Sequence, residues 1–108
     1  MSLTTARFNQ SPSEVKRYLV DFTLDLATGE SLVSIPAPTI TSPSGELIPT
    51  LVVSSIALAP AVGGQITMFT FFVSGGTAGQ NYEIDFLAST TLTQVLECVV
   101  AFNTAVKT

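Results

Sequence analysis

The sequence has no histidine and no tryptophan, and its one cysteine is Cys98. Without histidine, neither a Ser-His-Asp triad nor a Cys-His dyad can form, and the commonest metal ligand is missing. One cysteine permits neither an intrachain disulfide nor a cysteine metal cluster. We therefore expect no enzymatic activity, no cofactor and no metal site.

Charged residues are also scarce. Four cations and eight anions give a net charge of −4, whereas a nucleic-acid-binding surface has to neutralise several phosphates. The chain lacks the run of about 18 apolar residues that a membrane helix needs. It also lacks the glycine-rich phosphate-binding motifs of nucleotide sites. Nucleic acid, membrane and small-molecule substrates are therefore not expected partners.

Hydrophobic residues make up 46% of the 108 residues, which is enough for one folded domain with a core. Residues 1–13 are polar and show no periodicity. We therefore predict an N-terminal arm or short extended lead-in over 1–13 and a single domain over 14–108.

Strict alternation begins at Tyr18 and continues to Leu26, which predicts a half-buried strand. Asp21 and Asp25 fall on its polar phase, about 13 Å apart on an ideal strand. A glycosidase-like carboxylate pair needs about 5 to 10 Å. These two acids are therefore interpreted as solvated residues of an outer face.

Further β-rich segments cover 31–35, 51–58, 65–73, 82–88 and 93–102, and turn signals separate them. Prolines punctuate 35–48, which predicts an irregular edge strand and loop there. In the last segment Cys98 falls on the inward phase, where a free cysteine acts as a small hydrophobe. The predicted fold class is all-β: an immunoglobulin-like antiparallel β-sandwich of about six or seven strands.

A glycine-dense turn organises the chain between two of these strands. Gly75, Gly76 and Gly79 allow the backbone to reverse sharply, because glycine tolerates positive φ. The spacing Gly79-x-x-Tyr82 resembles the tyrosine corner of immunoglobulin-like sandwiches, in which the phenol bonds to upstream backbone.

The segment before that turn, 65–73, is apolar on both phases. Its two sets are Ile66, Met68 and Phe72, and Phe69, Phe71 and Val73. Such a strand is either central, with one face under a loop, or presents one face to another subunit. We predict Phe69, Phe71 and Val73 as partner-contact residues, and we expect a homo-oligomer.

Two motifs carry a family resemblance. Asp21-Phe22-Thr23-Leu24-Asp25-Leu26 with Gly29-Glu30, and Val73-Ser74-Gly75-Gly76-Thr77-Ala78-Gly79-Gln80-Asn81-Tyr82, resemble segments of small tailed-phage proteins labelled fibre-tail adaptor or head-tail joining proteins. Those proteins usually have tryptophan where this chain has Leu26 and near Phe72. Their final strand is also more charged.

The resemblance implies a non-enzymatic β-sandwich protein of a phage or prophage. Such a protein works as a virion structural or assembly component at a head-tail or tail junction, through contacts with other proteins of the particle. It would be found in the virion, and in the host cytoplasm during assembly. The alternative is an immunoglobulin-like binding module that recognises a host surface or glycan, although only two tyrosines and no tryptophan are present to form a sugar platform.

Overall fold

A computed structural model describes residues 4–43, 45 and 47–104, with side chains from Phe8 onward. Its eight strands are β1 (Thr4–Gln10), β2 (Val15–Asp21), β3 (Leu32–Ser34), β4 (Thr39–Thr41), β5 (Leu51–Leu58), β6 (Met68–Gly75), β7 (Asn81–Thr90) and β8 (Val95–Thr104). A short 3₁₀ turn, η1 (Thr23–Asp25), follows β2.

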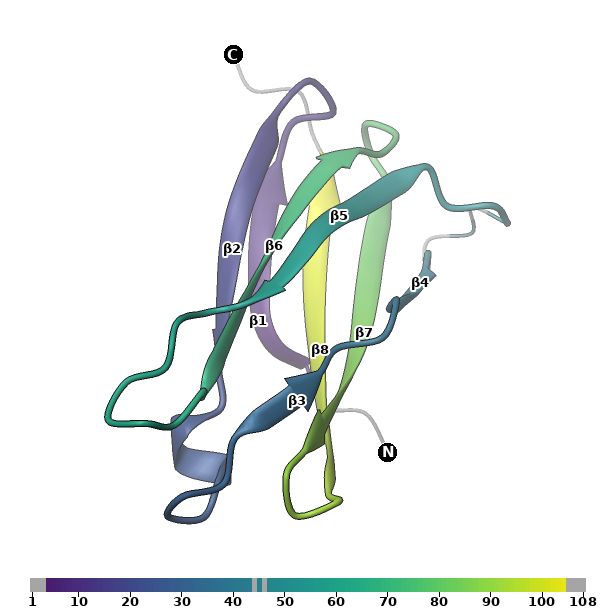
Figure 1. Cartoon of the computed structure of the whole chain (residues 1–108). Helices are drawn as coiled ribbons and strands as arrows, with labels where there is room; N and C mark the ends of the chain where they lie inside the picture. Colours follow the sequence, from purple (N-terminus) through teal and green to yellow (C-terminus); the bar gives the residue numbers. More distant parts are fainter. Residues whose placement is uncertain (1–3, 44, 46, 105–108) are drawn as a thin grey trace.

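The strands form two sheets packed face to face (Figure 1). Sheet 1 has the order β1-β8-β7-β3, with β4 also paired to β7, and sheet 2 has the order β2-β6-β5. Every pairing is antiparallel except that of β1 with β8, which is parallel. In immunoglobulin order, β2, β5 and β6 correspond to strands B, D and E, while β7 and β8 correspond to F and G. The predicted fold class is confirmed.

The number of strands is eight and not six or seven. Residues Thr4–Gln10, expected to be an arm or lead-in, form β1 and pair with β8. The proline-rich stretch contributes β4, only three residues long, between Pro38 and Pro43. The division into an arm over 1–13 and a domain over 14–108 stays a prediction.

Strand β2 ends earlier than the alternation predicted. Asp21 Oδ1 accepts a hydrogen bond from the Thr23 backbone N–H at 2.8 Å and another from Thr23 Oγ1. Local bonds of this kind compete with a sheet ladder. The chain therefore turns into η1, which leaves Leu24 99% exposed. The predicted strand from Tyr18 to Leu26 is wrong beyond Asp21.

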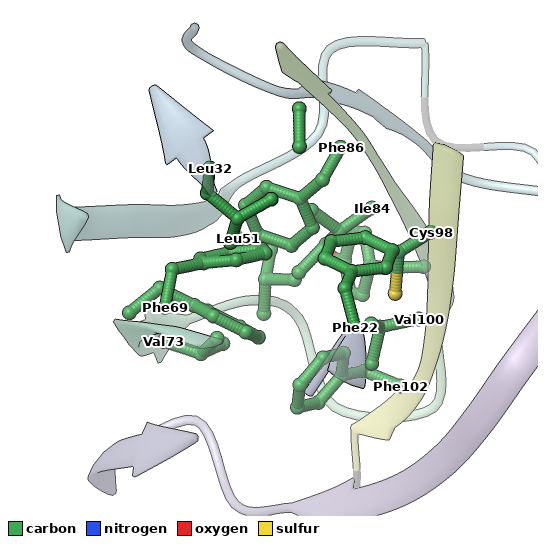
Figure 2. Packing of buried hydrophobic residues seen from close by; sticks show 13 residues of the cluster. Phe22, Leu32, Leu51, Phe69, Val73, Ile84, Phe86, Cys98, Val100 and Phe102 are labelled. Atoms are coloured by element: carbon green, nitrogen blue, oxygen red, sulfur yellow. The ribbon is translucent and has the colours of Figure 1, made fainter. Parts of the chain in front are cut away.

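The core lies between the sheets and is rich in phenylalanine (Figure 2). The Phe86 ring, from β7, lies 5.0 Å from the Phe69 ring and 4.7 Å from the Phe71 ring, both from β6. Such centroid distances are typical of aromatic pairs in protein cores. Cys98 is 3% exposed in the same cluster, so its predicted inward phase is confirmed.

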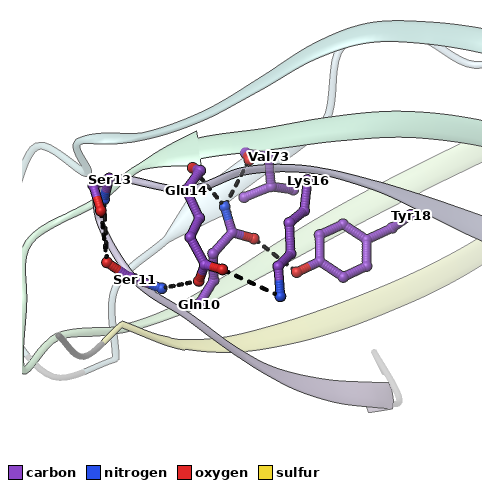
Figure 3. A network of polar contacts seen from close by, with 7 residues as sticks. All are labelled: Gln10, Ser11, Ser13, Glu14, Lys16, Tyr18 and Val73. Atoms are coloured by element: carbon purple, nitrogen blue, oxygen red, sulfur yellow. Dashed lines mark hydrogen bonds and ion pairs between the residues drawn. The ribbon is translucent and has the colours of Figure 1, made fainter. Parts of the chain in front are cut away.

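A buried glutamine joins three strands near the start of the chain (Figure 3). Gln10 ends β1 and is 1% exposed. Its amide nitrogen donates to the backbone carbonyls of Val73 (2.7 Å) and Glu14 (3.0 Å), and its oxygen accepts from the Tyr18 hydroxyl at 2.7 Å. The side chain thereby satisfies its own polar groups and holds β1 to β2 and β6.

The glycine turn has the predicted geometry. Gly75, Gly76 and Gly79 have φ values of 73°, 90° and 86°. A Cβ on Gly75 would lie 2.9 Å from the carbonyl oxygen of Thr50, so the site has no room for a side chain. The Tyr82 hydroxyl accepts the backbone N–H of Thr77 at 2.9 Å. This bond to upstream backbone confirms the tyrosine corner.

Candidate functional site

The predicted contact residues Phe69, Phe71 and Val73 lie in the core. Each is 0% exposed and belongs to the hydrophobic cluster between the sheets. A partner of the folded chain cannot reach side chains without exposed surface. Of the two apolar phases of β6, these three residues form the inward one. The other phase, with Met68 and Phe72, points out of the sandwich.

The outward phase of β6 lies in the middle of a three-stranded surface, which we call the outer face of sheet 2. In cross-strand register its rows are Val15–Ser74–Val52, Arg17–Phe72–Ser54, Leu19–Thr70–Ala57 and Asp21–Met68. Residues that face each other across neighbouring strands share one side of a sheet. These side chains therefore form a continuous surface.

Exposed apolar side chains are grouped on this surface. Val15, Leu19 and Val52 are 67%, 56% and 51% exposed, and Phe72 on the central strand β6 is half-buried. Single exposed apolar residues are ordinary on proteins, whereas grouped ones mark contact sites. The grouping on one sheet face makes it the candidate functional site.

Two charges lie on the same face as the apolar residues, both on β2. Arg17 lies across from Phe72, and Asp21 lies across from Met68. The hydrogen bonds from the Thr23 side chain and backbone hold the pKa of Asp21 below its usual value of 3.8. Asp21 is therefore ionised throughout the physiological range.

The outer face of sheet 1 differs in charge. Glu83, Asp85 and Glu97 lie on β7 and β8, with Leu87 directly across from Glu97. These acids have the phase opposite to the core residues of their strands. The described side chains of this outer face thus include three acids, of which Glu97 is exposed and Glu83 and Asp85 are half-buried, whereas exposed apolar side chains are grouped on the outer face of sheet 2.

A cavity of about 420 Å³ opens between the two sheets beside β2. Tyr18, Val20 and Phe22 line its side toward β2, and Leu96 and Val100 line its side toward β8. We call it the β2 slot. Its volume is within the range of small-ligand pockets, and its lining is mainly apolar, with the carboxylates Asp21, Asp25 and Glu97 as its charged residues.

The acidic residues that line the β2 slot come from three different elements. Asp21 ends β2 whereas Asp25 ends η1, so they are not on one strand as predicted. Over residues 4–43, 45 and 47–104 no group of three His, Cys, Asp or Glu residues is placed to hold a metal ion. Within the same residues no helix is long and apolar enough to cross a membrane.

Sequence reasoning missed a buried carboxylate. Glu30 is 1% exposed; its Oε1 accepts the Ala27 backbone N–H at 2.9 Å and its Oε2 accepts the Thr90 hydroxyl at 2.5 Å. Gln65 adds a bond to the Glu30 carbonyl. The Gly29-Glu30 motif was the sequence feature that could have indicated this carboxylate. In the structure Glu30 joins the turn that follows η1 to the end of β7.

The fold and its surfaces define a small immunoglobulin-like β-sandwich with one apolar outer face. Comparison with known families is more specific, because the model of the family described as "Podophage GP4 fiber-tail adaptor protein gp77" matches residues 10–103. The chain belongs to this family of phage structural proteins.

Other comparisons add little. No curated protein matches the chain. The solution structure of amebosin aligns over 95% of both chains at 15% identity, with a TM-score of 0.41. A score that low carries no argument about function.

Proposed function

We propose that this protein is a non-enzymatic virion component that links a phage tail to its fibre through protein contacts. In this proposal the outer face of sheet 2 binds one of those two neighbours. Family membership supports the role. The observation that supports the surface is the grouping of exposed Val15, Leu19 and Val52 around Phe72.

The composition of this face fits a contact surface. The centres of protein interfaces are depleted in charge and enriched in aromatic residues, methionine and arginine. Here Phe72 and Met68 come from the central strand, and Arg17 lies directly across from Phe72. Covering exposed apolar surface contributes about 25 cal/mol per Å² before the costs of association.

The contrast between the two outer faces supports an adaptor role. An adaptor has to hold two different neighbours, and surfaces of different chemistry select different partners. The acidic face with Glu83, Asp85 and Glu97 would suit a basic surface. The apolar face of sheet 2 would suit another apolar surface.

The virion assignment is tested by mass spectrometry of density-purified particles from a strain that produces the phage. We expect the polypeptide to copurify with complete particles in a fixed copy number. Its reproducible absence from complete particles would overturn the proposal.

The face is tested by complementing a phage that lacks the gene with a Val52→Arg variant. Val52 is 51% exposed on the outer face of sheet 2, and Leu92, 55% exposed in the turn between β7 and β8, supplies the matched control Leu92→Arg. We expect Val52→Arg to fold but to give particles without the protein or without fibres in electron micrographs. Leu92→Arg should give normal particles. Normal particles from Val52→Arg would assign the contact to another surface.

A further inference from the structure

Strand β2 is the edge of sheet 2, and its outer side is not paired with any strand of the described chain. In Figure 1 it lies at the upper left of the fold, and the loop between β5 and β6 extends farther left below it. It is seven residues long, contains neither proline nor glycine, and keeps an unbroken register with β6. A regular edge of this kind is a template for pairing with another chain.

The other edges carry the features that prevent such pairing. Strand β5 has a register shift between Ser54 and Ala57, with φ of 52° at Ser55. Strands β3 and β4 have only three residues each, and β1 has a register shift between Thr4 and Ala6. Bulges and very short strands are the usual protection of sheet edges. Strand β2 has neither. Its charged residues are Arg17, Asp21 and Lys16, and Lys16 is already paired with Glu14 of the same chain at 3.4 Å.

One hydrogen bond just beyond the end of β2 shows which of its residues bond toward β6 and which bond toward the open side. The Phe22 N–H donates to the Thr67 carbonyl at 2.8 Å, on the side of β6. Residues of an antiparallel strand bond alternately to one side and to the other. Arg17, Leu19 and Asp21 therefore direct their N–H and C=O groups to the open side.

The side chains of these three residues are self-complementary. In an antiparallel pair of two β2 strands related by a two-fold axis through Leu19, Leu19 lies opposite Leu19 of the second copy. Arg17 then lies opposite Asp21 of the second copy, and this pair occurs twice. Opposite charges directly across a ladder are favourable. A two-fold interface needs one patch that complements itself, as this edge does.

We propose that two copies of this chain associate through their β2 edges, which joins the two copies of sheet 2 into one continuous six-stranded sheet. Leu19 lies on the axis, and Arg17 pairs with Asp21 of the second copy on each side of it. The sequence-based expectation of a homo-oligomer thereby gains a specific interface.

The β2 slot supports the same partner. Tyr18 and Val20 line the slot on the inner phase of β2, and both are only half-buried. In the proposed register Tyr18 lies opposite Val20 of the second copy. Pairing therefore covers apolar side chains that the single chain leaves partly open to water.

Charge reversal tests the register by sedimentation velocity over a wide range of protein concentration. We expect Arg17→Asp to weaken association at least about tenfold, because both ion pairs become repulsive. The double variant Arg17→Asp with Asp21→Arg should restore it, since each pair is reversed and not lost. An equimolar mixture of the Arg17→Asp and Asp21→Arg single variants should associate as a heterodimer.

A backbone variant tests the edge itself. The N–H of Leu19 points to the open side, so Leu19→Pro removes a donor of the proposed interface and leaves the ladder to β6 intact. Proline is tolerated on edge strands in that orientation. We expect a folded monomer, with an unfolding transition measured alongside to establish folding.

Two results would overturn the inference: a wild-type chain that sediments as a monomer at every concentration, or an Arg17→Asp variant that associates like the wild type. The inference is separable from the proposed tail contact, because Val52 lies on β5, two strands from the β2 edge. Val52→Arg should self-associate like the wild type even where it fails to join particles.

Discussion

At the scale of single residues, the polar groups inside this sandwich have definite partners, and two of them give measurable effects. Tyr82 is 0% exposed, and its hydroxyl accepts the Thr77 N–H at 2.9 Å. The ring belongs to the core, while the oxygen holds the glycine turn against β7. The two contributions can be separated by removing only the oxygen.

We expect Tyr82→Phe to lower the free energy of unfolding by about 1–2 kcal/mol, because a part-buried N–H loses its acceptor. Urea denaturation measures the change. Tyr18→Phe is a comparison variant: it removes the donor to the buried Gln10 oxygen at 2.7 Å, so it should also lower the free energy of unfolding. A Tyr82→Phe variant as stable as the wild type would show that the corner bond contributes nothing to stability.

Asp21 gives a prediction about pH. Its pKa is lowered mainly by the Thr23 hydroxyl and next by the Thr23 backbone N–H. Because the folded-state pKa lies below the unfolded one, the stabilisation is present at neutral pH. It is lost as the pH falls through the folded-state pKa.

An NMR titration of the Asp21 carboxyl should therefore give a midpoint below 3.8 in the wild type. In Thr23→Val the midpoint should rise toward that value, since only the backbone donor remains. An unchanged midpoint in Thr23→Val would contradict the assigned cause.

At the scale of elements, strand β6 shows what an apolar pattern can and cannot predict. The period of two predicted the strand, but both phases are apolar, so the pattern did not say which phase faces the core. The two-layer packing decides it: Phe69 and Phe71 contact Phe86 from sheet 1, whereas Phe72 lies between Arg17 and Ser54 on the outer face.

Two phenylalanines of β6 make the distinction measurable. We expect Phe71→Ala to cost about 3–5 kcal/mol of unfolding free energy, because it empties a fully buried site. Phe72→Ala, in the same strand and of the same chemistry, should cost less than about 1 kcal/mol. Thermal denaturation of both variants checks this, and equal losses would show that the outer face is covered in the single chain.

In β2 the alternating pattern is clear, but it continues in the sequence beyond the residue at which the strand ends. Alternation persisted to Leu26, but the Asp21-x-Thr23 hydrogen bonds ended the strand. Local side-chain bonds of this kind are visible in a sequence only as a composition of Asp, Thr and Ser. The same composition also occurs within strands, so the end of β2 could not be read from it.

At the scale of the whole molecule, the sandwich depends on pairing between distant parts of the chain. Strand β1 pairs with β8 from Thr4–Val99 to Gln10–Thr104. The sequence could not predict this pairing, because residues 1–13 show no periodicity. The position of a parallel edge strand is set by the strand with which it pairs. The sandwich, the glycine turn and the tyrosine corner were predictable because each has a local signature. A contact surface formed across three strands has none.

Removing residues 1–13 tests the division between arm and domain. We expect the chain beginning at Glu14 to lose about 3 kcal/mol or more of unfolding free energy, since β8 loses a ladder and Gln10 no longer holds Tyr18 and Val73. Guanidinium denaturation compared with the full chain measures it. A truncated chain of unchanged stability would support an arm that is not part of the folded domain.

The parallel pairing of β1 with β8 also has a mechanical consequence. The chain enters the fold at the start of β1 and leaves the described part at the end of β8, and the two points face opposite ends of the ladder (Figure 1). Tension applied between these two points acts along both strands. The hydrogen bonds between β1 and β8 are therefore loaded in shear together, and they do not break one after another.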